Sequence, residues 1–426
     1  MERWRHTLAF HAVRLGDLDL LQNVVQGRRS FIFDTDYDGA SLLIHCAKNG
    51  NLPILKWLIY RGADVTMVDN AERTALLHAG IHGSLTTVQW LLSEGGGNIR
   101  DRCMRSETIL HHAAIHGHLD IVIWLVNKGL ISVAETNVYG HTVLMCATHA
   151  GQLVVVQWLL LHGHACINDK DDDGRSLLHI AILSESLAVT QWLVCHTSIS
   201  VSDRSHDGKT ALLHAAGKCI NITRWLLDRA GASMLDKDDH GANPLHFAVS
   251  HFDVSDVEWL ADQHHACITE TDDEGFTPIH YAALHDRVST TTWLLIRGAI
   301  CEADPTLWVI LLTLPEYRWM EWLSVIPIFH PIPTNSVIVW TPLQKKMIQK
   351  GTRIGKRLPW YKEQRRVAVQ TSCLLPTSLS DLILAYVDFS SVDEMWSTQL
   401  LQTTQKRPLD ESTLRRSKRI AHNSLG

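Results

Sequence analysis

The sequence predicts an all-α fold, a solenoid of repeated helix-turn-helix-hairpin units with an irregular C-terminal extension. Two independent registers predict it. A residue that can cap a helix N-terminus recurs in steps of 33 or 34 residues, at Thr7, Ser41, Thr74, Thr108, Thr142, Ser176, Thr210, Asn243 and Thr277. Tryptophan recurs at the same steps, at Trp57, Trp90, Trp124, Trp158, Trp192, Trp225, Trp259 and Trp293. The chain therefore contains nine units over about residues 4–304.

One unit, residues 107–130, illustrates the expected local structure. Thr108 can satisfy free backbone N–H groups at the start of a helix. Gly117 stands where this helix must end, in a left-handed conformation that costs glycine little. Residues 119–126 are apolar at helical spacing, which predicts a short, buried second helix. Neither helix can bury its apolar face alone, so each unit needs a neighbour on both sides.

The segment Thr108-Ile109-Leu110-His111-His112-Ala113-Ala114, followed by Gly117-His118, resembles an ankyrin repeat. The resemblance implies that the first helix of each unit lines a concave groove and that the groove and the hairpins bind protein. A tight hairpin requires glycine, and the units begin with Asp38-Gly39, Tyr139-Gly140, Asp173-Gly174, Asp207-Gly208, His240-Gly241 and Glu274-Gly275.

Residues 4–36 are expected to form a degenerate N-terminal repeat that caps the stack, and residues 37–304 form repeats 2–9. Repeats 2–5 keep the helix-ending glycine as Gly50, Gly83, Gly117 and Gly151. Repeats 6–9 place Glu185, Cys219, Phe252 and Asp286 there. A non-glycine residue in the left-handed conformation costs about 1–2 kcal/mol. We therefore expect the C-terminal half of the stack to be less regular and to open first.

The repeat period ends after Pro305. Residues 305–340 are rich in tryptophan and proline and are expected to form an irregular cap over the last repeat. Residues 341–370 form a basic linker, residues 371–396 a helical segment, and residues 397–426 a basic tail that we expect to be disordered.

The composition is typical of a soluble intracellular protein, with a formal net charge of -6 and 46% hydrophobic residues. The nine cysteines contain no CxxC pair, and we expect small buried residues rather than a disulfide framework. A reducing compartment, cytoplasmic or nuclear, follows from this. No signal peptide or membrane-length apolar run occurs, so we expect no membrane association, no cofactor and a monomer.

The candidate partner-binding residues occupy two positions of the repeat, four and eight residues after the capping residue. The +4 position is mostly histidine or aromatic, and the +8 position carries further histidines. We expect these positions to form a ladder along the concave groove, with partner-binding residues His45, His78, His82, His112, His116, His214, Phe247 and Tyr281. The alternative is packing within the stack. Because histidine titrates near neutral pH, partner binding is expected to weaken in mild acid.

Other chemistries are disfavoured by the pattern. Gly208-Lys209-Thr210 imitates a phosphate-binding loop, but Asp203 stands where that loop needs a second glycine. The pairs His78/His82 and His112/His116 have zinc-ligand spacing, yet they are repeat positions without an intervening HExxH glutamate. No catalytic grouping emerges, so we expect neither a metal site nor an enzyme.

The segment Leu375-Pro376-Thr377-Ser378-Leu379, continuing to Val387, resembles the start of an F-box and, more weakly, a SOCS box. The resemblance implies a substrate receptor of a cullin-RING ubiquitin ligase that contacts a Skp-type adaptor through Leu375, Pro376, Leu379, Ile383 and Tyr386. Ser378 and Ser380 depart from the F-box pattern. The alternative is a helix that caps the last repeats.

The basic tail contains a cluster typical of a nuclear import signal, formed by Arg415, Arg416, Lys418 and Arg419. A solvated tail is the alternative. The basic residues of 344–366 lack any nucleic-acid-reading motif, so nucleic acid is not the expected partner. The sequence thus predicts a protein-binding scaffold or adaptor, with a ubiquitin-ligase receptor and a nuclear regulator as alternatives.

Overall fold

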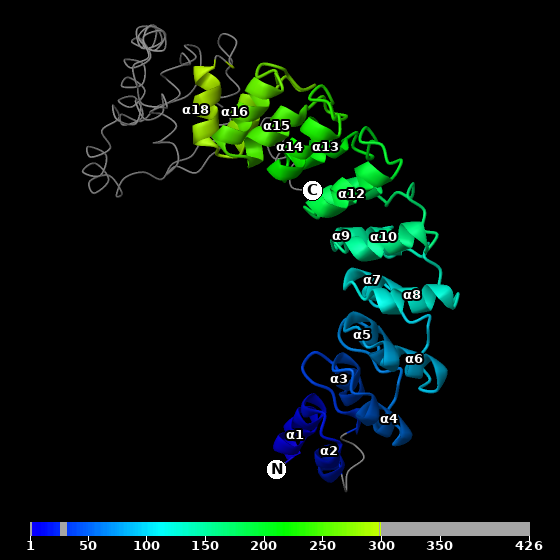
Figure 1. Cartoon of the computed structure of the whole chain (residues 1–426). Helices are drawn as coiled ribbons and strands as arrows, with labels where there is room; N and C mark the ends of the chain where they lie inside the picture. The colour runs from blue at the N-terminus through cyan, green and yellow to red at the C-terminus, as the bar shows by residue number, and fades with distance from the viewer. Residues whose placement is uncertain (1, 26–31, 298, 300–426) are drawn as a thin grey trace, which may run out of the picture. The chain divides into compact units, whose positions relative to one another are not determined.

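The computed structural model describes residues 2–25, 32–297 and 299. The chain divides into two compact units, Met1–His214 and Ala215–Gly426. Within the described residues, the helices alternate between a first and a second helix of nine successive pairs, which confirms the predicted repeats (Figure 1). We number the repeats 1–9 by these pairs, so that α1 and α2 form repeat 1 and α17 and α18 form repeat 9.

The helices of the first unit are α1 (Glu2–Leu15), α2 (Leu18–Val25), α3 (Leu42–Lys48), α4 (Leu52–Tyr60), α5 (Ala75–Ile81), α6 (Leu85–Ser93), α7 (Ile109–Ile115), α8 (Leu119–Asn127), α9 (Val143–His149), α10 (Leu153–Leu161), α11 (Leu177–Leu183) and α12 (Leu187–His196). Helix α13 (Ala211–Ala216) spans the boundary between the units. The second unit contains α14 (Ile220–Arg229), α15 (Pro244–His251), α16 (Val254–Gln263), α17 (Pro278–Leu284) and α18 (Val288–Ile296).

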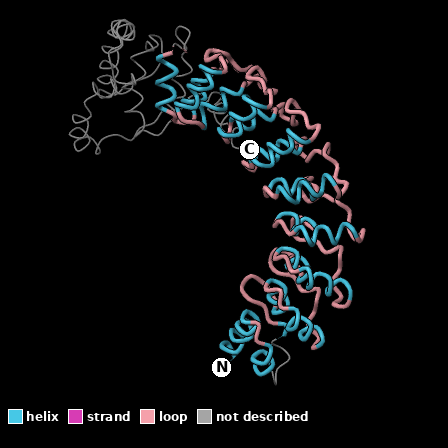
Figure 2. Tube along the Cα trace, viewed as in Figure 1, coloured by secondary structure: helices cyan, strands magenta, loops and turns pink. Residues whose placement is uncertain are grey.

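Each unit has two layers of helices. In the first unit the first helices pack in the order α1, α3, α5, α7, α9 and α11, and the second helices α6, α8, α10 and α12 pack beside them (Figure 1). In the second unit α15 packs against α17 and α16 against α18. The described residues form only helices and loops, apart from isolated bridges such as Thr35 to Ser41 (Figure 2). The all-α solenoid is therefore confirmed.

Capping residues begin the first helices as expected. The Ser41 hydroxyl accepts the Ile44 N–H at 3.4 Å, and the Asn243 carboxamide oxygen accepts the Leu245 N–H at 3.0 Å. Thr7 is an exception, because it lies inside α1 rather than at its start. No glycine or proline precedes Thr7, so nothing in the sequence ends the helix between Glu2 and this residue. The prediction that Thr7 caps a helix is wrong.

The core of the first unit runs continuously between the helix layers. First helices contribute residues such as Leu76, Leu77 and Ala79, and second helices contribute residues such as Val88 and Leu91, all fully buried. The small alanine side chain leaves room for the second helix to pack closely. Stacking thus buries the apolar face that one repeat leaves open.

The repeated tryptophan lies on the second helices and is half-buried in most repeats. A cation lies over the ring in several cases. The Arg224 guanidinium lies 4.8 Å from the Trp259 ring centroid, and the Arg297 guanidinium lies 5.0 Å from that of Trp293. In repeats 2 and 3, Lys56 Nζ lies 5.3 Å from the Trp90 centroid. This position therefore joins neighbouring repeats through packing and cation–π contacts.

The turn between the two helices follows the glycine prediction in repeats 2–5. Gly50, Gly83, Gly117 and Gly151 have φ between +66° and +78°. Glu185 and Asp286 keep the left-handed conformation without glycine, both with φ of +57°. Phe252 avoids it and is extended, with φ of −94°.

The alignment of Cys219 with the glycine position is wrong. In repeat 7 the tryptophan follows the capping residue by 15 positions, against 16 in repeats 2–6, 8 and 9. The turn of repeat 7 is therefore one residue shorter, and Cys219 serves as the N-cap of α14 with φ of −139°. The missing residue removes the left-handed position itself.

The hairpins between repeats form a row held by backbone hydrogen bonds. The N–H groups of Asn70, Met104 and Val138 donate to the carbonyls of Asp38, Ala71 and Arg105 in the preceding hairpins, at 2.9, 3.1 and 3.0 Å. The predicted glycines adopt positive φ at the tips, with +75° at Gly39 and +71° at Gly140. Each tip is thereby fixed by its neighbour rather than by its own loop alone.

The seven cysteines of the described residues are all free thiols. Cys46, Cys103 and Cys146 are buried, whereas Cys166, Cys195 and Cys267 are exposed. The prediction of burial is therefore wrong for Cys166 and Cys267, which lie in loops after second helices. Among the described residues, none of the helices combines the length and the apolar character that crossing a lipid bilayer requires.

Candidate interaction surface

The predicted ladder depends on the side chain that closes each hairpin, five residues before the capping residue. We call this the hairpin position; it holds Asp36, Asp69, Cys103, Asn137, Asp171, Ser205, Asp238 and Asp272. The Asp36 Oδ1 atom accepts the N–H groups of Asp38 and Ala40 at 2.9 and 2.8 Å. Asp69 accepts the N–H groups of Ala71 and Arg73 in the same way, both at 2.9 Å. The carboxylate thus fixes the turn.

The other carboxylate oxygen is used by the +4 residue of the same repeat. His45 Nε2 donates to Asp36 Oδ2 at 2.7 Å, and His78 Nε2 donates to Asp69 Oδ2 at 2.8 Å. In repeat 9 the Tyr281 hydroxyl donates to Asp272 Oδ2 at 2.9 Å. The pair therefore ties the hairpin to the first helix inside one repeat.

Most of the +4 position is buried, in repeats with this pairing and in repeats without it. His78, His112, His214, Phe247 and Tyr281 are each at most 8% exposed, whereas His45 is half-buried. The expectation that the whole +4 position forms an open ladder is therefore wrong, because the hairpin closes over these side chains. Packing within the stack, the alternative, describes them better.

The +8 position is open in repeats 3 and 4, where His82 and His116 are exposed. The His82 ring stacks on that of His78, with centroids 6.2 Å apart and planes 20° apart. His251 and His285 are half-buried, and their ring centroids lie 5.8 Å apart in the second unit. Of the predicted partner-binding residues, His82 and His116 remain accessible.

Burial also changes the acid–base chemistry of the buried histidines. It lowers the pKa of His78 to about 4 and the pKa values of His112 and His214 to about 3. These side chains are neutral throughout the range from pH 5.5 to pH 8. A weakening of binding in mild acid cannot arise from them.

A further set of histidines, three residues after the capping residue, was not singled out as functional from the sequence. The backbone N–H of Ser176 donates to His179 Nδ1 at 3.2 Å, which completes a reciprocal cap around the helix start. His179 Nε2 then donates to the Lys209 carbonyl of the next hairpin at 3.1 Å. In the sequence, the fourth residue of segments such as Thr108-Ile109-Leu110-His111 marks this histidine. The role of the histidine is structural.

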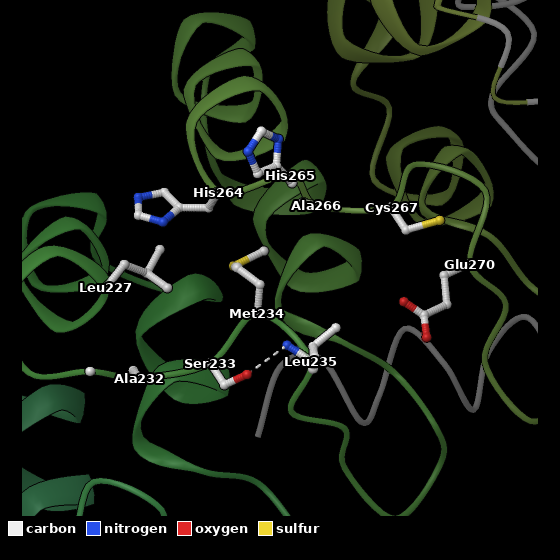
Figure 3. Close-up of a pocket in the computed structure, with 11 residues that line it drawn as sticks. Leu227, Ala232, Ser233, Met234, Leu235, His264, His265, Ala266, Cys267 and Glu270 are labelled. Carbon is white, nitrogen blue, oxygen red and sulfur yellow. Dashed lines mark hydrogen bonds between the residues drawn. The ribbon is translucent and has the colours of Figure 1, made fainter.

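A pocket of about 530 Å³ lies in the second unit, between the loops that follow α14 and α16 (Figure 3). Figure 3 shows the rings of His264 and His265 on the opposite side of the pocket from Glu270. Glu270 is engaged elsewhere, by Lys237 Nζ at 2.7 Å and Asn243 Nδ2 at 2.9 Å. The polar groups that line this pocket therefore do not converge on one point.

The remaining predicted sites lie outside the described residues. These are the adaptor-binding residues Leu375, Pro376, Leu379, Ile383 and Tyr386, and the nuclear-import residues Arg415, Arg416, Lys418 and Arg419. The same holds for the cap of 305–340, the linker of 341–370 and the tail of 397–426. All of them stay predictions.

Fold and contacts define a helical repeat protein in which backbone hydrogen bonds join successive hairpins and, in repeats 2, 3 and 9, a carboxylate ties the hairpin to its own first helix. The family model for ankyrin repeats, in three copies, matches the chain seven times in overlapping windows, from residues 9–103 to residues 232–305. The chain belongs to the ankyrin repeat family. A comparison with curated protein sequences gave no match. Ankyrin repeats are generally protein–protein interaction modules, and the family is typically non-enzymatic.

Proposed function

We propose that this chain is a non-enzymatic scaffold or adaptor that binds a protein partner through the hairpin tips and the adjacent first-helix groove. The observation that carries the proposal is a set of large apolar side chains at the tips of the first unit. Tyr37 is 91% exposed, Met104 62% and Tyr139 54%. Val138 beside Tyr139 is also exposed. Exposed aromatic residues and methionine are typical of protein interfaces.

The tips present these side chains on a rigid support. The backbone hydrogen bonds from Asn70 to Asp38, Met104 to Ala71 and Val138 to Arg105 join successive hairpins. A partner that binds several tips therefore orders little additional backbone, which lowers the entropic cost of association. The exposed +8 histidines, His82 and His116, extend the proposed surface onto the first helices.

The test replaces Tyr37, Met104 and Tyr139 with alanine in the full chain. A matched control replaces three equally exposed apolar residues outside the hairpins, Tyr60, Val154 and Leu161, which are 74%, 61% and 65% exposed. Affinity purification with quantitative mass spectrometry should lose the main partners with the tip variant and retain them with the control. Equal partner sets for both variants, with circular dichroism unchanged, would contradict the proposal.

The two alternative functions depend on the C-terminal extension. Comparing the full chain with a chain that ends at Gln370 tests the ligase-receptor hypothesis. Recovery of a Skp-type adaptor and a cullin by the full chain alone would support it, and identical partners would argue against it. Replacing Arg415, Arg416, Lys418 and Arg419 with alanine tests nuclear import in the same way, by the position of a tagged protein in cells.

A further inference from the structure

Repeat 4 departs from the hairpin pairing that repeats 2 and 3 share. In repeat 3 the hairpin residue Asp69 binds His78, and Arg73 stands just before the capping residue and donates to Asp69 at 2.9 Å. In repeat 4 the hairpin residue is Cys103, and Glu107 replaces the arginine. The +4 residue is still histidine, His112. The carboxylate has moved four residues along the chain, and the positive charge has gone.

The three side chains of repeat 4 converge in a buried cluster. Cys103 Sγ lies 3.7 Å from Glu107 Oε2, and His112 Nδ1 lies 3.8 Å from the same oxygen. All three residues are buried, and one ligand atom from each lies within 4.8 Å of the other two. Such a mixture of thiol, carboxylate and imidazole is a donor set that zinc prefers.

The cluster is poorly satisfied as it stands. The Asp69 carboxylate of repeat 3 accepts two backbone N–H groups, an arginine and a histidine. Among the described residues, the Glu107 carboxylate has only the Cys103 thiol and the Asn137 amide at 3.5 Å as donors. His112 Nδ1 is too far from Glu107 for a hydrogen bond, and His112 Nε2 is buried without a partner in this part of the chain. A buried carboxylate with such weak partners is costly.

The neighbouring repeat contacts the cluster through an amide. In repeat 5 the hairpin and +4 residues are Asn137 and Cys146, where repeats 2 and 3 have aspartate and histidine. Asn137 Nδ2 lies 3.5 Å from Glu107 Oε1 and 3.7 Å from Cys146 Sγ. The Asn137 amide therefore links the cluster to repeat 5.

We propose that Cys103, Glu107 and His112 form a zinc-binding site in repeat 4, beside repeat 5, with a water molecule as the fourth ligand. Zinc bond lengths place tetrahedral ligand atoms about 3.4–3.6 Å apart. The observed 3.7 and 3.8 Å contacts to Glu107 need to shorten by a few tenths of an ångström, and the ligand atoms of Cys103 and His112, which lie within 4.8 Å of each other, must also approach. On binding, the Cys103 thiol loses its proton to solvent, and the thiolate and carboxylate together balance the two positive charges of zinc.

The test is a titration of the metal-free full chain with Co²⁺ and with Zn²⁺. Cobalt bound to a thiolate gives a near-ultraviolet charge-transfer band, and we expect it to saturate at one equivalent. Zinc should remove the band and raise the unfolding temperature. The double variant Cys103→Asp/Glu107→Arg introduces the residues that repeat 3 uses, so it retains a pairing that folds in this same chain. It should abolish the band and the zinc stabilisation.

Two single variants complete the design. Glu107→Gln keeps the shape and removes the charge, and it should weaken zinc at least about tenfold. Cys46→Ala is the matched control, because Cys46 is buried elsewhere and alanine stands at the corresponding position in repeats 3 and 4. It should bind like the wild type. Because the exposed thiols of Cys166, Cys195 and Cys267 can also contribute to a cobalt signal, the site is identified by the difference between the wild type and the cluster variants. Equal affinity of the wild type and both cluster variants, or no band at all, would overturn the proposal.

Discussion

The helix-joining turns of repeats 2–5 and those of repeats 6–9 perform the same task with different chemistry. The earlier turns use glycine at positive φ, and the later ones use a strained glutamate or aspartate, an extended phenylalanine, or a shorter loop. Glycine also makes room for the next repeat. His118 Nε2 donates to the Ile81 carbonyl at 2.8 Å, and a Cβ atom on Gly83 would lie 2.5 Å from the His118 ring. Conformational freedom and close approach therefore act together.

The largest expected effect of a single substitution comes from placing glycine at position 252, where the backbone is not left-handed. Phe252→Gly should lower the free energy of unfolding by about 3 kcal/mol or more. Phe252 is buried and extended, so glycine removes packing and relieves no strain. Urea unfolding followed by circular dichroism measures the loss. An unchanged midpoint would mean that the side chain contributes nothing to the second unit.

Acid is expected to weaken the stack by a similar amount for each of several buried histidines. His78, His214 and His246 have folded-state pKa values of about 4, 3 and 4, below the ordinary value of 6.5, because burial disfavours the charged ring. Between about pH 6.5 and pH 4 the unfolded chain binds more protons, so stability present above pH 6.5 is lost as the pH falls. Each histidine contributes on the order of 2–3 kcal/mol. A urea midpoint that is constant from pH 7.5 to pH 5 would contradict this.

Replacing a turn glycine in the earlier repeats should cost somewhat less. Gly83→Ala combines left-handed strain with the contact to the His118 ring, and we expect a loss of about 2 kcal/mol. Gly129→Ala is the control, because Gly129 has φ of +61° but no atom of the described residues lies within 4 Å of the place that its Cβ would take. It should show the strain alone, about 1 kcal/mol. Equal losses for the two variants would mean that close approach is irrelevant.

The smallest expected effect is an increase in the free energy of unfolding. Glu185→Gly relieves a left-handed glutamate and should stabilise the chain by about 1 kcal/mol. Hydrogen exchange around the turn between α11 and α12 should slow accordingly. The same experiment on the wild type tests whether repeats 6–9 open before repeats 2–5. If the repeats exchange in the opposite order, turn strain does not set local stability.

Much of the fold follows from local rules that the sequence displays directly. Ser41 and Asn243 cap helices because a short polar side chain reaches the free N–H groups, and Gly50 marks a left-handed turn. The prediction for Thr7 was wrong because the residues from Glu2 onward already form the helix that contains it. The prediction for Cys219 was wrong because the turn of repeat 7 is one residue shorter than in the other repeats, which shifts every later position within that turn.

The candidate surface was harder to predict for a different reason. The accessibility of His78 depends on Asp69, nine residues earlier, which draws the ring beneath the hairpin. A pattern of histidines on one helix face does not reveal this closure, since the acid lies on another element. The exposure of Tyr37 and Met104 was also not predictable from the sequence, because hairpin tips have no hydrophobic period.

The repeated tryptophan has a spectroscopic consequence. Every repeat from the second to the ninth carries one indole at the same place on its second helix, so the emission of the chain contains a built-in reporter for each of these repeats. Because the rings are mostly half-buried, solvent should shift their emission when a repeat opens. A set of variants that each keep one of these indoles, with phenylalanine at all other tryptophans, would give a separate fluorescence signal for each repeat.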